Sequence, residues 1–175
     1  DRDMGVQLHH HFKLGKGIIR EKISVSQGEG RNITSGNVGG FDYTGRIEWL
    51  PMGKFAGKGD YFNSDLKREK KPKLAFGITY DWHDNAARQY GQLKSFMSET
   101  RTLATVFADM MFKYKGFSMM AEYANKQTPG RSSVIAYDAA GNVDEYFYTG
   151  TGLNVQAGYL FKSNWEIAGR YTQIN

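Results

Sequence analysis

The stretch RTLATVFADMMFKYKGFSMMAEYA, residues 101–124, decides the fold class of the chain. Its first half reads with a period of two, because the even positions of 102–114 carry no charge while the odd positions carry every charge. A helical stripe at three-four spacing also fits this half alone. After the turn at Lys115-Gly116, however, a second alternating run begins at Phe117. Two alternating runs joined by a tight turn predict a β-hairpin.

The composition of the 175-residue chain is typical of a β-rich protein with many turns. It has 21 Gly but only 3 Pro, and aromatic residues make up 14% of it. The length suits one domain, so we expect residues 1–175 to be a single β-barrel domain or part of one. The chain has no Cys, which excludes disulfide bonds and thiolate metal sites.

Charge and hydropathy narrow the class of protein further. The net charge is +5, and the lysines cluster in LKREKKPK at 66–73. Such a run is usually a solvated loop, so we predict no nucleic-acid partner. No stretch approaches the roughly 18 apolar residues of a membrane helix. A membrane protein built of strands stays possible, because a barrel strand turns only about every second residue toward lipid.

The alternating pattern extends along the chain and predicts eight strands. They cover about 4–13, 17–26, 40–50, 73–82, 101–114, 117–124, 150–161 and 164–174. Short connections at 14–16, 114–116 and 162–164 alternate with long polar ones at 27–39, 83–100 and 126–149. Outer-membrane barrels have short periplasmic turns and long extracellular loops. The connection at 51–72 breaks this rhythm because it is long, so we expect an elaborated turn there.

The two faces of the predicted strands differ in chemistry. The apolar faces often end in aromatic residues, such as Tyr80 with Trp82 and Tyr159 with Phe161. The opposite faces are rich in Gly, Thr, Asn and Gln with single charged residues. Aromatic girdles and a polar interior are features of transmembrane β-barrels. We therefore predict an all-β fold, an antiparallel transmembrane β-barrel. Because alternation alone cannot tell inside from outside, a soluble β-barrel stays an alternative.

The segment GGFDYTGRIEWLPMGKFAGKGDYFNSDLKREKKPKLAFGITYDWHDNA, residues 39–86, resembles the phosphate-selective porin O and P family of Gram-negative outer membranes. RDMGVQLH at 2–9 and FADMMFKYKGFSMMAEY at 107–123 resemble it too. The resemblance implies a sixteen-stranded barrel in the bacterial outer membrane, usually a homotrimer, whose pore passes anions and in some members prefers phosphate. Eight strands would be about half of that barrel. We expect a fragment of a longer chain, or else a closed eight-stranded barrel.

A pore for anions needs fixed positive charge on its wall. If the apolar faces point outward, six cationic residues fall on the lumen wall: Arg20, Lys22, Arg46, Arg101, Lys113 and Arg170. Arginine suits phosphate because it stays protonated and presents a fork of donors. A Lys or Arg on the lipid face at mid-depth would cost roughly 2–4 kcal/mol, and the outward faces hold almost none. Glu21 and His10 are the exceptions on that face.

Acidic residues share the same predicted wall and weaken the anion prediction. They are Asp42, Glu48, Asp109, Glu122 and Glu166. Pairing between the two sets would cancel much of the field. HHH at 9–11 does not predict a metal site, because no Cys or nearby carboxylate cluster completes a zinc set. An outer-membrane barrel enzyme such as a lipase is a further alternative, for which Ser24 with His9 or His11 on the adjacent strand is the candidate pair, without further support.

The sequence therefore predicts a passive diffusion channel for small anions such as phosphate, without enzymatic activity or cofactor. A small non-conducting structural barrel and a soluble ligand-binding barrel are the alternatives. Small anions, the lipid bilayer and two further copies of the chain are the expected partners.

Overall fold

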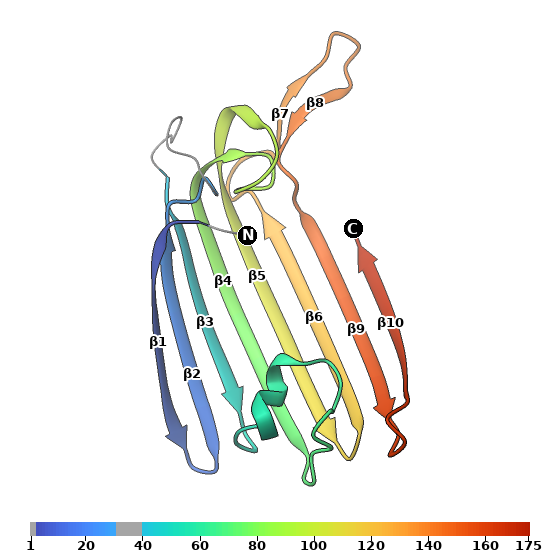
Figure 1. The fold of residues 1–175 in the computed structure, drawn as a ribbon. Helices are drawn as coiled ribbons and strands as arrows, with labels where there is room; N and C mark the ends of the chain where they lie inside the picture. The colour runs from blue at the N-terminus through green and yellow to red at the C-terminus, as the bar shows by residue number, and fades with distance from the viewer. Residues whose placement is uncertain (1–2, 31–39) are drawn as a thin grey trace.

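The chain folds into one large antiparallel sheet, as a computed structural model describes for residues 3–30 and 40–175. Eight strands lie side by side in the order β1-β2-β3-β4-β5-β6-β9-β10 (Figure 1). Their bounds are β1 (Gly5–Leu14), β2 (Gly17–Ser26), β3 (Asp42–Leu50), β4 (Lys73–Arg88), β5 (Phe96–Tyr114), β6 (Phe117–Gln127), β9 (Gly150–Leu160) and β10 (Glu166–Ile174). All eight predicted strands are confirmed, and each pairs with its neighbour in the chain, apart from the inserted hairpin β7–β8 between β6 and β9.

The hairpin β5–β6 has the turn that its sequence predicts. Tyr114 pairs with Phe117, so Lys115 and Gly116 are the two turn residues. Both have a positive φ, 50° and 93°, which is the conformation of a type I′ turn. A Cβ on Gly116 would lie 2.5 Å from the carbonyl oxygen of Leu160. Glycine is therefore required at this position for two reasons, the positive φ and the close approach of the Leu160 carbonyl group.

Two predicted loops contain more structure than their sequences indicated. β4 and β5 continue past the sheet as a long hairpin, so most of 83–100 is strand rather than loop. The register there is irregular between His83 and Arg88, which hides the alternation on which the prediction depended. The loop at 126–149 holds the small hairpin of β7 (Val134–Tyr137) and β8 (Val143–Tyr146). Most of the predicted loop 27–39 lies outside the described residues.

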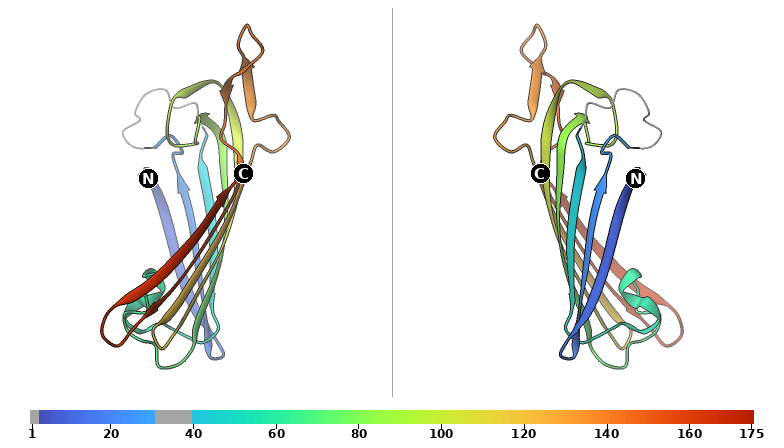
Figure 2. Two further views of the ribbon diagram at one scale, coloured as in Figure 1. Left: turned by 90° about the vertical axis from the view of Figure 1, so that its right-hand side faces the viewer. Right: turned by 90° about the vertical axis from the view of Figure 1, so that its left-hand side faces the viewer.

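The sheet is open. Over the part of the chain that the structure describes, β1 and β10 are the two edges and do not pair with each other. Figure 2 shows that the sheet is curved, with the segment after β3 on its concave side. The eight strands thus form a curved wall, and a closed eight-stranded barrel is not observed. No helix in 3–30 or 40–175 has the length and apolar character needed to cross a membrane.

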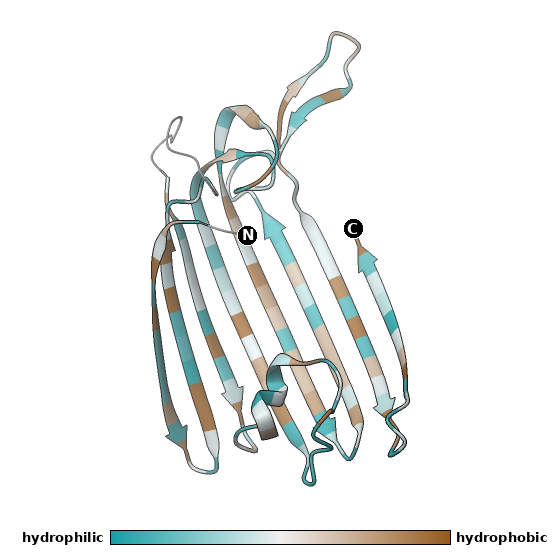
Figure 3. Cartoon of the chain, viewed as in Figure 1, coloured by the Kyte–Doolittle hydropathy of each residue, from teal (hydrophilic) through white to brown (hydrophobic). Residues whose placement is uncertain are grey.

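The convex face is apolar and the concave face is polar. Residues directly paired across the strands lie on one face, and along the row Ile23, Gly45, Tyr80 and Val106 this face carries no charge. Alternate colouring of polar and apolar residues runs along most strands (Figure 3). The apolar side chains of the convex face are largely exposed. The two exceptions predicted on that face pair with each other, since His10 Nδ1 lies 3.0 Å from Glu21 Oε2.

The long connection 51–72 is a folded linker that packs against one end of the concave face. It contains a short 3₁₀ segment, η1 (Ala56–Tyr61), and Phe55 packs with Ile18, Leu50 and Met111 in a small buried cluster. The linker lies at the same end of the sheet as the short turns (Figure 1). It thereby occupies part of the concave surface instead of extending away from it.

Several polar anchors hold the linker in place. Lys113 Nζ donates to three linker carbonyl oxygens. The Asp65 carboxylate accepts from the backbone amides of Glu69 and Gly116, and the Arg68 guanidinium donates to carbonyl oxygens at the β9–β10 turn. These contacts tie the linker to β5 and to two of the short turns.

Candidate functional site

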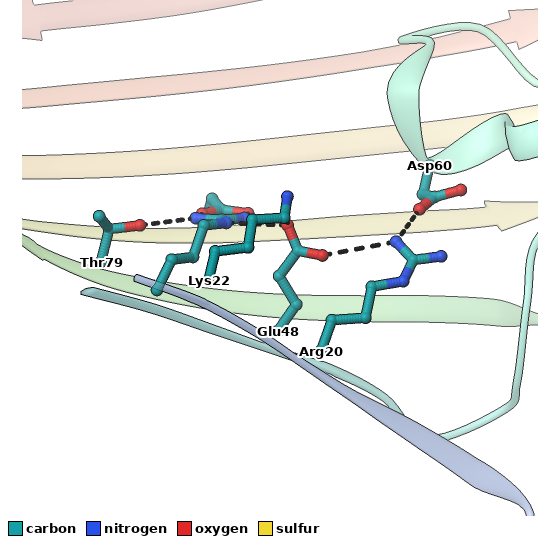
Figure 4. A network of polar contacts seen from close by, with 7 residues as sticks. Arg20, Lys22, Glu48, Asp60 and Thr79 are labelled. Atoms are coloured by element: carbon teal, nitrogen blue, oxygen red, sulfur yellow. Dashed lines mark hydrogen bonds and ion pairs between the residues drawn. The ribbon is translucent and has the colours of Figure 1, made fainter. Parts of the chain in front are cut away.

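A network of ion pairs crosses the concave face near its middle. Glu48 on β3 is its hub, because its carboxylate accepts from Arg46 Nε at 2.8 Å, Lys22 Nζ at 3.3 Å and Arg20 Nη1 at 3.4 Å. Figure 4 shows Glu48, Lys22 and Arg20 on one side of the sheet. Arg20 and Lys22 are on β2, one step apart on the same face. Because strand alternation places them on the same face, three of the predicted cations contact one carboxylate.

Arg46 extends the network across β4. Its guanidinium makes a two-pronged contact with Asp109 on β5, at 2.6 and 2.9 Å, and donates to Thr79 Oγ1 at 2.9 Å. Gly77 lies in register between Glu48 and Asp109, and a Cβ there would be 2.3 Å from Arg46 Nη2. The glycine therefore leaves the space through which Arg46 reaches the second strand. Bidentate arginine–carboxylate pairs of this kind are among the stronger charged contacts.

The folded linker closes the other end of the network. Asp60 in η1 accepts from Arg20 Nη1 at 2.5 Å (Figure 4). Three cations, Arg20, Lys22 and Arg46, are thus matched by three carboxylates, those of Glu48, Asp60 and Asp109. The group is formally neutral, so its long-range field is much weaker than that of three unpaired cations.

The remaining predicted cations lie apart from the network. Lys113 is buried beneath the linker, with 1% of its surface exposed, and does not face an open space. Arg101 lies toward the long-loop end of β5 and pairs with Glu99 at 2.7 Å. Arg170 is an exposed residue on the edge strand β10. The structure therefore brings together three of the six predicted residues and separates the others.

Two hollows lie beside the network on the concave face. One has a volume of about 480 Å³ and is lined by Arg46, Asp109 and residues of β6, β9 and β10. The second, about 430 Å³, lies toward the long-loop end and is lined by Asp42, Asp81 and Lys126 among others. Phe107 and Ala124 line both, so the two hollows adjoin.

Sequence reasoning missed the residues that complete the network and the hollows. Asp60 belongs to a linker whose fold the strand pattern does not describe, and Thr79 and Gly77 had no distinguishing motif. Phe107 did break the polar alternation of its face, which was a usable signal. Among residues 3–30 and 40–175, no group of three His, Asp or Glu side chains has an arrangement that could hold a metal ion.

Comparison with known proteins identifies no relative of this chain. It matches no protein-family model, no curated protein and no solved structure. The resemblance of residues 39–86 to phosphate-selective porins therefore stays a prediction from the sequence.

Proposed function

We propose that this chain forms part of the wall of a bacterial outer-membrane porin, a passive diffusion channel for small hydrophilic solutes. The observation that carries the proposal is the exposed apolar convex face opposite a polar concave face. A soluble protein rarely leaves so extended an apolar surface uncovered, whereas lipid would cover it without further contacts. The polar concave face would then border the solute path.

Aromatic residues at both ends of the convex face support a position within a bilayer. At the short-turn end, aromatic pairs with ring centres 5.0–6.2 Å apart are Trp49–Phe76, Phe112–Phe117 and Tyr159–Phe161. At the long-loop end, Phe41–Tyr43 and Tyr80–Trp82 are 6.3 and 6.4 Å apart. Aliphatic residues such as Ile47 and Ile78 lie between the two bands. This order matches the two girdles of outer-membrane barrels.

The length of the apolar face agrees with the thickness of an outer membrane. On β5 the face runs for eleven residues, or ten residue-to-residue steps, from Ala104 to Tyr114. That is about 34 Å along the strand, and about 26 Å for a strand tilted by roughly 40°. The apolar band of such barrels is about 25 Å tall. No Lys or Arg lies between the aromatic bands on the described convex face, where one would cost roughly 2–4 kcal/mol.

The charges on the concave face would determine the ion selectivity of the channel. The anion preference expected from Arg20, Lys22 and Arg46 is weakened by the three carboxylates that pair with them. Of the three remaining predicted cations, Lys113 is buried and Arg101 is paired, so the exposed Arg170 is the one that would favour small anions such as phosphate. We therefore propose weak rather than strict anion selectivity, in a homotrimer within the lipid bilayer.

The experiment is single-channel recording of the full-length protein in a planar bilayer under a KCl gradient. We expect stepwise conductance with a reversal potential slightly on the anion side. Arg46→Met should move the reversal potential toward cation selectivity, because Asp109 and Glu48 lose a partner. Arg101→Met is the matched control outside the network, and it should cause a smaller change.

The recordings also test the alternatives. No conductance from protein that is folded in detergent would overturn the porin proposal and favour a non-conducting barrel. Solubility and a folded state without detergent would favour a soluble barrel instead. Conductance with strong anion selectivity and block by phosphate would show that the ion pairs do not neutralise the wall.

A further inference from the structure

The larger hollow is a trough built from one row of cross-strand neighbours. Phe107 on β5 pairs with Ala124 on β6, Ala124 with Gly152 on β9, and Gly152 with Ile174 on β10. The two middle residues are small and form the floor, whereas Phe107 and Ile174 form the walls and are 42% and 82% exposed. A Cβ built on Gly152 meets no atom within 4 Å, so the space above the floor is open.

A polar rim follows one long side of the trough, from the next row of the sheet. Asn154 Nδ2 donates to Glu122 Oε2 at 2.9 Å, and Thr172 Oγ1 donates to Asn154 Oδ1 at 3.1 Å. Asp109 is already paired with Arg46, whereas Glu122 has no cation within 4 Å in the described part of the chain. The rim therefore presents mainly acceptors and one uncompensated negative charge.

We propose that this trough binds a sugar, an uncharged ring with one apolar face and several hydroxyl groups. An aromatic ring exposed on a polar wall offers a flat surface against which the C–H face of a sugar ring can pack. The hydroxyl groups of the sugar can donate to the carboxylate of Glu122 and exchange hydrogen bonds with Asn154. The volume of about 480 Å³ lies within the range of small-molecule sites.

The charges of the rim favour a sugar over a phosphate ion. The negative charge of Glu122 repels an anion, and the Arg46 guanidinium that could attract one is already bound to two carboxylates. The uncharged hydroxyl groups of a sugar are not repelled by Glu122 and do not need a free Arg46 guanidinium. The inference rests on the proposed diffusion function, because it names a solute class for the same concave wall.

The test is isothermal titration calorimetry of the full-length protein with maltose, in a polyoxyethylene detergent that carries no sugar headgroup. We expect saturable binding with a dissociation constant on the order of 1 mM. Phe107→Ala should weaken binding about five-fold, the loss of one aromatic contact. Gly152→Leu should abolish binding by filling the trough. Circular dichroism checks that each variant keeps its β structure.

The matched control is Gly45→Leu. Gly45 lies on the convex face, and a Cβ there also meets no atom within 4 Å. This variant should bind maltose like the unchanged protein. Absence of saturable maltose binding to folded protein, or equal binding by the Gly152→Leu and Gly45→Leu variants, would overturn the inference. Phosphate binding that is weakened by Phe107→Ala as much as maltose binding would also overturn the inference, because it would show that the trough does not prefer a sugar.

Binding in micelles does not depend on conductance, so the two proposals can fail separately. Maltose binding by a protein that forms no channel would keep the sugar site and overturn the diffusion function. Conductance without maltose binding would overturn the sugar site and keep the channel.

Discussion

Replacing Lys113 by methionine tests whether this buried side chain holds the linker 51–72 on the concave face. Its ammonium group donates to the carbonyl oxygens of Gly59, Phe62 and Ser64 at 2.6, 2.5 and 2.7 Å. Lys113→Met keeps an unbranched side chain that is one heavy atom shorter, and it removes all three hydrogen bonds. The three carbonyl groups then lose a donor that water does not readily replace at a site with 1% exposure.

The magnitude follows from these contacts. A hydrogen bond to a charged group contributes about 1.5–3 kcal/mol, so three would give roughly 4–9 kcal/mol before the cost of burying the ammonium. That desolvation cost is several kcal/mol. We expect the free energy of local opening of the linker to fall by about 3 kcal/mol. The open state then becomes about 100-fold more populated, and amide exchange through it becomes faster by the same factor.

Hydrogen–deuterium exchange with mass spectrometry measures this effect in peptides that cover 56–70. The amides of Ala56 and Glu69, which donate to the carboxylates of Glu69 and Asp65, should lose protection in Lys113→Met. Lys16→Met, in the exposed β1–β2 turn, is the control and should leave exchange unchanged. Exchange of 56–70 within three-fold of the unchanged protein would refute the reasoning, and the apolar cluster around Phe55 would then be the main anchor.

Three further changes test other parts of the structure. Ile23→Lys on the convex face should cost roughly 2–4 kcal/mol when the protein folds into liposomes, whereas Ser24→Lys on the concave face should cost less than 1 kcal/mol; equal costs would contradict the assignment of the faces. Gly116→Ala should lower stability in urea by about 1–3 kcal/mol, because φ is 93° and the new Cβ would lie 2.5 Å from a carbonyl oxygen. The pKa of Asp138 is lowered chiefly by the hydrogen bond from the Asn142 side chain, so its contribution to the β7–β8 hairpin is complete above pH about 4 and is lost as the pH falls through the folded pKa. Hydrogen exchange in the hairpin should therefore rise at low pH, and Asp138→Asn should abolish that pH dependence.

Most of the fold was predicted from patterns within short stretches of the sequence. Strand alternation and tight turns such as Lys115-Gly116 are encoded within a few residues, so the eight strands and their faces could be read directly. The extensions of β4 and β5 were missed because the register shift between His83 and Arg88 interrupts the alternation. In that hairpin Leu103 packs with Ala86 and Phe147, a contact between residues that no local pattern connects.

The candidate site was predicted only in its composition. The sequence placed cations and carboxylates on the same face, but not which of them meet. Arg46 and Asp109 are 63 residues apart, and their contact depends on the register of three strands and on the absence of a side chain at Gly77. Lys113 was predicted on the open wall, yet the linker covers it, because a folded connection has no periodic signal.

By itself, the sequence determined the strands, their turns and the separation of an apolar face from a polar one, because backbone geometry fixes side-chain direction at a period of two. Only the tertiary structure decided the curvature of the open sheet, the pairing of charges around Glu48 and the trough between Phe107 and Ile174. These features depend on strand register and on the position of the linker. Both are set by contacts between residues distant in the chain. Such contacts form only when the gain from packing exceeds the entropy cost of closing the intervening loop, and this depends on the whole fold.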